Sequence, residues 1–202
     1  LFDAKTIVFI GFLSFINNAL ATGSSRFLTF GLGEGNIKKL QKTFSTVLTA
    51  HIGLALIIVV LAETAGLWFL YHKMVIPAER MEAAVFTFHL SILTAFFTLT
   101  QVPYNAIIIA HERMNIYAYV SIVDAVGKLL IVYALAIGDV DKLKLYAILL
   151  CLLQLGIMTF YRFYCSKRFE EVRFRFVFEK NIFKEIASFS GWSLFASSSI
   201  AL

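Results

Sequence analysis

The chain has 202 residues, of which 59% are hydrophobic and only 15% are charged, and its mean hydropathy is +0.80. A soluble domain needs more polar surface and a disordered chain needs fewer apolar residues, so the composition excludes both and indicates an integral membrane protein. The net charge of +5 lies in short segments between apolar runs, as membrane topology requires, which argues against a nucleic-acid partner.

Apolar runs of about 20 residues are long enough to cross a hydrocarbon core of about 30 Å as helices. Strands of a barrel would instead show alternating segments of about 10 residues. We therefore expect an all-α, polytopic membrane helix bundle, with residues 1–202 forming a single transmembrane domain. In chain order the predicted spans are 6–30, 47–70, 83–110, 116–137, 145–164 and 186–202.

Basic residues between the spans predict their direction, because cytoplasmic loops are enriched in lysine and arginine. One side carries Arg26, Lys38, Lys39, Lys42, Arg113, Arg162, Lys167, Arg168, Arg173, Arg175, Lys180 and Lys184, and the other carries only Lys73, Arg80, Lys142 and Lys144. The first side is predicted to be cytoplasmic, which places Leu1 outside. The chain begins with Leu rather than Met and ends within a predicted span, so we expect a fragment that lacks at least one span upstream.

Polar side chains recur at every third or fourth position of several spans, which places them on one helix face. Span 6–30 contains Asn18 and Thr22, followed one turn later by Arg26. The stripe of span 83–110 consists of Thr87, Ser91, Thr94, Thr98, Gln101 and Asn105. Small hydroxyl residues also join membrane helices by close packing and interhelical hydrogen bonds. Stripes on several spans that include amides and charges favour a polar cavity between helices.

The segment "QVPYNAIII" (101–109) places Pro103 within the third span. Proline removes a backbone donor and disfavours helix at the residue before it, so we expect a break or hinge there. Such breaks are tolerated where a neighbouring helix or a cavity satisfies the freed carbonyl.

The fourth span, "SIVDAVGKLLIVY" (121–133), contains an acid and a base one turn apart. Asp124 and Lys128 share a face with Tyr117 and Ser121. An acid N-terminal to a base at this spacing can form an ion pair along the helix. Either the two charges neutralise each other against a neighbouring helix, or they form a substrate or proton site. The residues alone do not decide between these interpretations.

Other chemistry is not indicated by the sequence. There is no HExxH or GxSxG motif and no metal-ligand spacing, so we expect no catalytic residues, no metal, no cofactor and no enzyme activity. Cys151 and Cys165 are predicted to be free thiols. The segment "SKRFEEVRFRFVFEKNIFKEI" (166–186) alternates basic and aromatic residues, which is typical of an interfacial segment and is compatible with binding of anionic lipid headgroups.

Three stretches, "SSRFLTFGLGEGNIKKLQKTFST" (24–46), "VPYNAIIIAHERMNIYAYVSI" (102–122) and "FKEIASFSGWSLF" (183–195), resemble the Wzx-type flippases of O-antigen and lipopolysaccharide biosynthesis. These transporters belong to the superfamily that includes the multidrug (MATE) exporters. The resemblance covers nearly the whole chain, but none of these stretches is a catalytic motif.

The resemblance implies a transporter of two lobes around a central cavity, of which this chain would form one lobe and the start of the next. It also implies a lipid-linked oligosaccharide on undecaprenyl pyrophosphate as substrate, the bacterial inner membrane as location, and other polysaccharide-assembly proteins as partners. Lys128 and Arg26 would then offset the pyrophosphate charge. The alternatives are a cation-coupled multidrug exporter and, less in keeping with the short loops, a polysaccharide polymerase or ligase.

Overall fold

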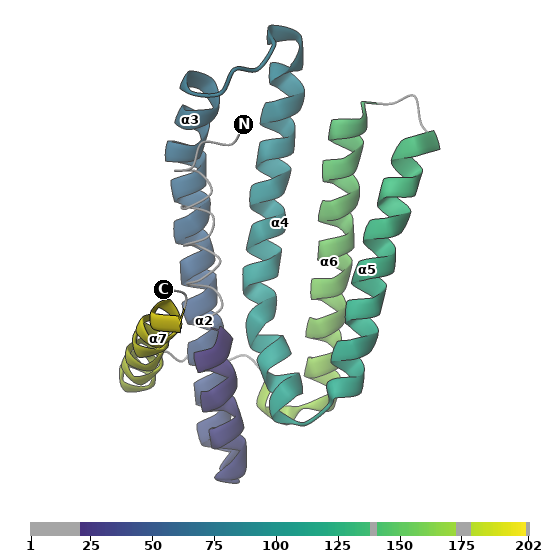
Figure 1. Ribbon diagram of the computed structural model, residues 1–202. Helices are drawn as coiled ribbons and strands as arrows, with labels where there is room; N and C mark the ends of the chain where they lie inside the picture. Colours follow the sequence, from purple (N-terminus) through teal and green to yellow (C-terminus); the bar gives the residue numbers. More distant parts are fainter. Residues whose placement is uncertain (1–20, 138–140, 173–178, 201–202) are drawn as a thin grey trace. The chain divides into compact units, whose positions relative to one another are not determined.

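The computed structural model describes residues 21–137, 141–172 and 179–200, and helices are the only regular secondary structure in this part of the chain (Figure 1). Residues 21–33 are helical. The following elements are α2 (Ile37–Leu61), the π-helical turn η1 (Ala62–Gly66), α3 (Leu67–His72), α4 (Ala78–Ala110), α5 (Met114–Ile137), α6 (Lys142–Arg168), the 3₁₀ turn η2 (Glu170–Val172) and α7 (Lys180–Ile200). The predicted all-α fold class is confirmed.

Four helical stretches are long and apolar enough to cross a membrane: Ile37–His72, Ala78–Ala110, Met114–Ala136 and Lys142–Arg168. They contain the predicted spans 47–70, 83–110, 116–137 and 145–164, apart from Ile137 at the end of the third. Only the last part of span 6–30 falls within the described residues. The chain is helical over most of span 186–202, but α7 is not among the four stretches, since its polar residues lower its hydropathy.

The break expected at Pro103 does not interrupt the helix. Pro103 lies inside α4, which is helical from Ala78 to Ala110, and its side chain is fully buried. A single proline removes only the hydrogen bond that its own nitrogen would donate, and the bonds on either side preserve the helix. Whether Pro103 acts as a hinge stays a prediction.

The described residues divide into two compact units, both of which include parts of α2, α4 and α6. Unit 1 comprises the described residues within 1–50, 102–113 and 165–202, and unit 2 those within 51–101 and 114–164. In unit 1 the rings of Phe44 and Tyr104 meet edge to face, with centroids 5.5 Å apart. This ring pair joins the first half of α2 to the end of α4, in a core that also contains Leu28, Ile107 and Ile108.

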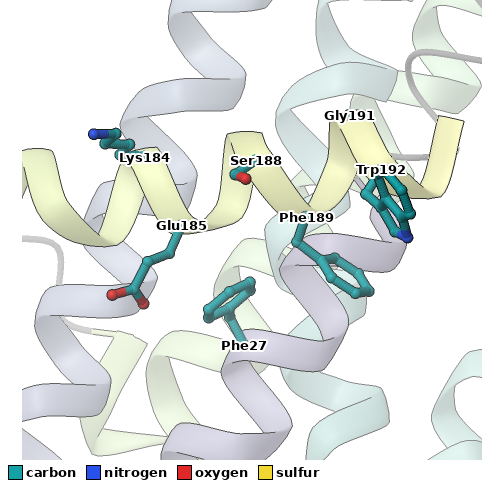
Figure 2. A pocket seen from close by; sticks show the side chains of 7 residues that line it. All are labelled: Phe27, Lys184, Glu185, Ser188, Phe189, Gly191 and Trp192. Atoms are coloured by element: carbon teal, nitrogen blue, oxygen red, sulfur yellow. The ribbon is translucent and has the colours of Figure 1, made fainter. Parts of the chain in front are cut away.

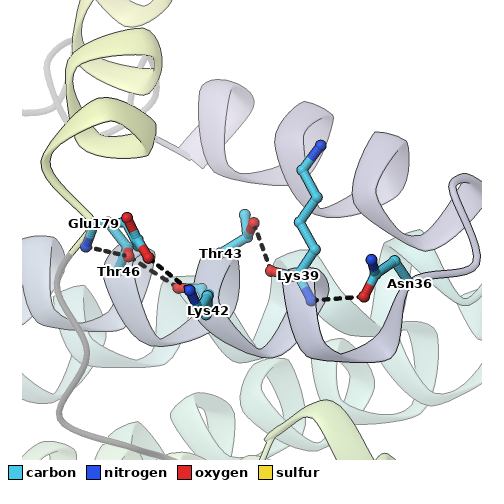
Figure 3. Close-up of polar contacts among 6 residues, drawn as sticks. All are labelled: Asn36, Lys39, Lys42, Thr43, Thr46 and Glu179. Carbon is cyan, nitrogen blue, oxygen red and sulfur yellow. Dashed lines mark hydrogen bonds and ion pairs between the residues drawn. The ribbon is translucent and has the colours of Figure 1, made fainter.

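The start of α2 is fixed by side chains of unit 1 (Figure 3). Asn36 caps the helix, because its Oδ1 accepts a hydrogen bond from the backbone N–H of Lys39 at 3.1 Å. The buried Thr46 hydroxyl accepts a hydrogen bond from the backbone N–H of Glu179, and the Glu179 carboxylate pairs with Lys42 at 2.8 Å. The residue that precedes α7 is thereby held on α2.

The end of α4 adopts a left-handed cap. Glu112 has φ +56°, the backbone N–H of Glu112 bonds to the carbonyl of Ile109, and that of Arg113 bonds to the carbonyl of Ile108. This is the Schellman arrangement, in which glycine normally occupies the left-handed position. The chain therefore turns from α4 into α5 within three residues, at the cost of backbone strain at Glu112.

In unit 2, ion pairs join the helix ends that the loop charges predict to face outward. Lys144 of α6 pairs with Glu82 of α4 at 2.7 Å, and Arg80 pairs with Asp141 at 3.3 Å. Both pairs connect the start of α4 with the start of α6. These contacts agree with Figure 1, where α4 and α6 lie side by side.

Candidate functional site

Two glutamines from different helices meet inside unit 2. The side-chain amide of Gln154 in α6 donates a hydrogen bond to Oε1 of Gln101 in α4, at 2.7 Å and in a partly buried position. Each amide has further hydrogen-bonding capacity, because a glutamine carries two N–H donors and an oxygen with two lone pairs. An interhelical hydrogen bond of this kind fixes the level of α4 against α6.

A close contact between α5 and α6 lies next to this hydrogen bond. A Cβ built on Gly127 would lie 2.8 Å from the Cδ1 atom of Leu153, so glycine permits an approach that a larger residue would hinder. Leu153 is the residue before Gln154. Gly127 therefore packs against the residue next to the α6 member of the glutamine pair.

Asp124 and Lys128 lie on either side of this contact on α5. The Lys128 ammonium donates to Oδ2 of Asp124 at 2.6 Å, so the predicted ion pair is present. The Asp124 side chain is 31% exposed and that of Lys128 is 57% exposed. The buried Oδ1 of Asp124 accepts no hydrogen bond. The carboxylate thus has one oxygen on Lys128 and one that is still free to accept.

The depth of the pair follows from helix geometry. Asp124 and Lys128 lie about 15 Å and about 21 Å from the first residue of α5, at a rise of 1.5 Å per residue. The helix of 24 residues is about 36 Å long, so the two charges lie near its middle. We call Gln101, Asp124, Lys128 and Gln154 the polar belt, since the Gln101–Gln154 bond and the contact of Gly127 with Leu153 place these residues on neighbouring turns of unit 2.

Four hydroxyl groups of the predicted stripes bond to their own helices, whereas the buried hydroxyl of Thr87 has no hydrogen-bond partner among the described residues. Ser91, Thr94 and Thr98 donate to the carbonyls of the residues four positions earlier, at 2.8, 2.8 and 3.0 Å. Ser121 donates in the same way to Tyr117 on α5, and the Tyr117 ring is exposed. The interhelical bonds considered from sequence are therefore not made by these four hydroxyls. Each oxygen retains lone pairs that can accept a hydrogen bond.

A second polar contact in unit 2 joins η1 to α4. Nε2 of His89 lies 3.3 Å from Oε2 of Glu63, and Nδ1 of His89 is 2.8 Å from the carbonyl of Val85. Glu63 belongs to the π-helical turn, a feature that often occurs at functional positions. Both side chains thus have partners within the helix bundle, as packing residues in a membrane helix require.

The remaining predicted residues lie in unit 1 or outside the described residues. The Arg26 guanidinium lies over the ring of Phe189 in α7, with its carbon 4.3 Å from the ring centroid. Asn105 belongs to unit 1, and its buried Oδ1 accepts no hydrogen bond. Asn18 lies outside the described residues.

Sequence reasoning missed Gln154 and Gly127. Gln154 is an isolated amide in the apolar run "ILLCLLQLGI", and that isolation was the available signal, because an unpaired amide in a membrane helix needs a partner. Gly127 gave no comparable signal, since single glycines are frequent in membrane helices.

The polar belt can bind a polar ligand by charge and hydrogen bonds, but it contains no nucleophile and base in contact. Within the described ranges no group of three potential metal ligands occurs. Comparison with known proteins adds no relative: no protein-family model, no curated protein and no solved structure matches the chain.

Proposed function

We propose that the chain forms part of a membrane transporter that flips an undecaprenyl-pyrophosphate-linked oligosaccharide across the bacterial inner membrane during polysaccharide biosynthesis. The observation that carries the proposal is the polar belt: an exposed ion pair and two amides on neighbouring turns of a membrane helix bundle. Such groups are costly in a membrane and usually face a polar path. The resemblance to Wzx-type flippases supplies the substrate class.

The chemistry of the belt suits this substrate. A pyrophosphate is strongly anionic, and the Lys128 ammonium can leave Asp124 to pair with it. Because Lys128 exchanges one anionic partner for another, its positive charge is neutralised both before and after the substrate binds. Asp124 thereby prevents Lys128 from being an unpaired charge in the membrane when no substrate is bound.

Sugar hydroxyls require both donors and acceptors. The free N–H groups and lone pairs of Gln101 and Gln154 offer both. The hydroxyl oxygens of Thr94 and Thr98 offer acceptors, because their protons already bond to α4. These groups would replace the water that the sugars lose on leaving the cytoplasm. Arg26 stays a predicted second cation, and the proposal depends on Lys128.

The test uses a strain in which the gene is deleted and complemented with the full-length protein or its variants. In the deletion strain, undecaprenyl-linked oligosaccharide is expected to accumulate on the cytoplasmic side of the inner membrane. Unchanged lipid pools together with new drug sensitivity would instead identify a cation-coupled multidrug exporter. Accumulation of unpolymerised units on the outer side would indicate a polymerase or ligase.

Lys128 is then tested by paired substitutions. Lys128→Ala is expected to lower the flipping rate at least about tenfold, which is the loss of one charge-assisted contact of about 1.4 kcal/mol or more. Lys128→Arg keeps the positive charge and should retain most of the activity. Lys142→Ala, at the exposed start of α6, is the matched control and should flip at the wild-type rate. Wild-type activity in Lys128→Ala would refute the headgroup role.

A further inference from the structure

A groove of about 830 Å³ lies in unit 1 between the helical segment 21–33 and α7 (Figure 2). Its apolar wall consists of three aromatic side chains: Phe27 from segment 21–33, and Phe189 and Trp192 from α7. The rings of Phe27 and Phe189 meet edge to face with centroids 6.2 Å apart. Trp192 is 76% exposed, an unusual position for the largest apolar side chain of this helix.

Small residues of α7 leave room beside this wall. Ser188 and Gly191 also line the groove, and a Cβ built on Gly191 would meet no atom within 4 Å. The groove is therefore an open depression with aromatic rings on one side and small residues of α7 on the other. Such a surface can accommodate an apolar chain.

Two cations lie in or beside the groove, and neither has a carboxylate partner among the residues that the structure describes. The Arg26 guanidinium lies beside the groove lining, over the ring of Phe189 in the apolar wall. Lys184 lines the groove and is exposed. In Figure 2, Lys184 and Glu185 point away from α7 on opposite sides, so Glu185 does not neutralise Lys184.

We propose that this groove binds an anionic phospholipid, with one acyl chain along Phe27, Phe189 and Trp192 and the headgroup phosphate at Lys184 and Arg26. The two cations complement the charge of a phosphate, and the aromatic wall complements a chain. Tryptophan and long basic side chains together are typical of the membrane interface. Glu185 also lines the groove, and its carboxylate repels an anionic headgroup, so it weakens the selection that the two cations provide.

The loop charges support the inner leaflet as the source of this lipid. Arg26 and Lys184 both belong to the basic side that the sequence predicts to be cytoplasmic, and anionic lipids attract basic segments there. Free phosphate would not use the aromatic wall, and a neutral lipid would not use the two cations. The proposal is independent of the transported substrate.

Trp192 provides a direct probe, because residues 1–202 contain only two tryptophans. The full-length protein is reconstituted with Trp192 as its only tryptophan, and its fluorescence is quenched by phospholipids with brominated chains. Two bilayers are compared: brominated phosphatidylglycerol in phosphatidylcholine, and brominated phosphatidylcholine in phosphatidylglycerol. The brominated phosphatidylglycerol is expected to quench the fluorescence of Trp192 at the lower mole fraction. A protein with Trp68 as its only tryptophan should show no such preference.

Charge variants identify the headgroup contact. Lys184→Gln and Arg26→Gln are each expected to reduce the preference for phosphatidylglycerol about fivefold, the value of one basic side chain near a membrane surface. Glu185→Gln should increase the preference. Lys38→Gln is the matched control, since it removes the same charge from an exposed site outside the groove and should leave the preference unchanged.

Three results would overturn the proposal. Equal quenching by both lipids would show that the site does not select charge. If Lys184→Gln, Arg26→Gln and Lys38→Gln all lowered the preference for phosphatidylglycerol equally, the selectivity would come from the overall surface charge and not from the groove. No quenching of Trp192 by either lipid would show that protein, rather than lipid, fills the groove. Folding is controlled separately by thermal unfolding of each variant, and Lys184→Gln still tests the contact should Arg26→Gln fail to fold.

Discussion

At the residue scale, polar groups in these helices are satisfied in two different ways. The hydroxyls of Ser91, Thr94 and Thr98 bond to their own backbone, whereas Gln101 requires a partner from another helix. A short hydroxyl side chain reaches the carbonyl one turn earlier, but a glutamine amide extends too far for this and points to a neighbour. The amides are therefore the residues that specify helix contacts.

This difference predicts a measurable coupling between Gln101 and Gln154. In a double-mutant cycle with Gln101→Leu and Gln154→Leu, the coupling energy is expected to be about 0.6–1.7 kcal/mol, the range for interhelical hydrogen bonds in membranes. The free energies are measured by unfolding in mixed micelles. Thr94→Val with Gln154→Leu is the control pair and should couple by less than about 0.3 kcal/mol. Strictly additive losses for the two glutamines would contradict the contact.

The sequence predicts some of these residue contacts and not others, for a physical reason. Asp124 and Lys128 lie on one helix, and their spacing alone determines that they can pair. Gln101 and Gln154 lie on different helices, so their contact depends on how α4 and α6 align. That alignment is set by packing and by the outer ion pairs, which hydropathy does not encode.

At the element scale, the α5–α6 contact depends on the absence of a side chain at Gly127. Gly127→Val is expected to destabilise the protein by about 1–3 kcal/mol, because two methyl groups would overlap the Leu153 side chain. Gly156→Ala on α6 is the matched control, since a Cβ there meets no atom within 4 Å. That variant should be neutral or up to about 1 kcal/mol more stable, through the helix propensity of alanine. Thermal unfolding in detergent measures the stability of both variants. Equal effects of Gly127→Val and Gly156→Ala would contradict the close approach of α5 and α6.

The cap of α4 makes a second element-scale prediction. Glu112 has φ +56° and forms no ion pair with the residues that the structure describes, so Glu112→Gly should relieve left-handed strain without loss of such a contact. We expect a gain of about 1 kcal/mol in the free energy of unfolding. Glu112→Ala keeps the Cβ and should give no comparable gain. A glycine variant less stable than the alanine variant would refute the strain.

Hydropathy predicted four elements well, because a membrane span requires a long apolar run whatever its neighbours are. Hydropathy did not predict the π-helical turn at Ala62–Gly66. Such a turn contains one more residue than an α-helical turn, and one extra residue does not change the average hydropathy of the span. The predicted span 83–110 does run through Pro103, as α4 does, and the expectation of a break there came from local preference instead. Local preference disfavoured helix there, but a helix bonded on both sides tolerates the loss of one hydrogen bond.

At the scale of the whole molecule, the direction of the spans stays a prediction from the loop charges. Cys151 and Cys165 are buried free thiols and are the two cysteines within residues 1–202, so their replacement by alanine removes competing thiols from this part of the protein before labelling. Val75 lies fully exposed in the loop between α3 and α4, and Lys38 lies exposed near the start of α2. With a membrane-impermeant maleimide, Val75→Cys should react in intact cells, and Lys38→Cys only after permeabilisation. The reverse pattern would invert the topology.

The bonding of the stripe hydroxyls to their own backbone has a consequence for motion. A helix whose hydroxyls are engaged internally can slide or rotate past its neighbour without breaking cross-links at each step, so the friction between such helices is low. In unit 2 the Gln101–Gln154 bond and the outer ion pairs Lys144–Glu82 and Arg80–Asp141 are then cross-links between α4 and α6. A change of register between these two helices would have to break and re-form all three contacts.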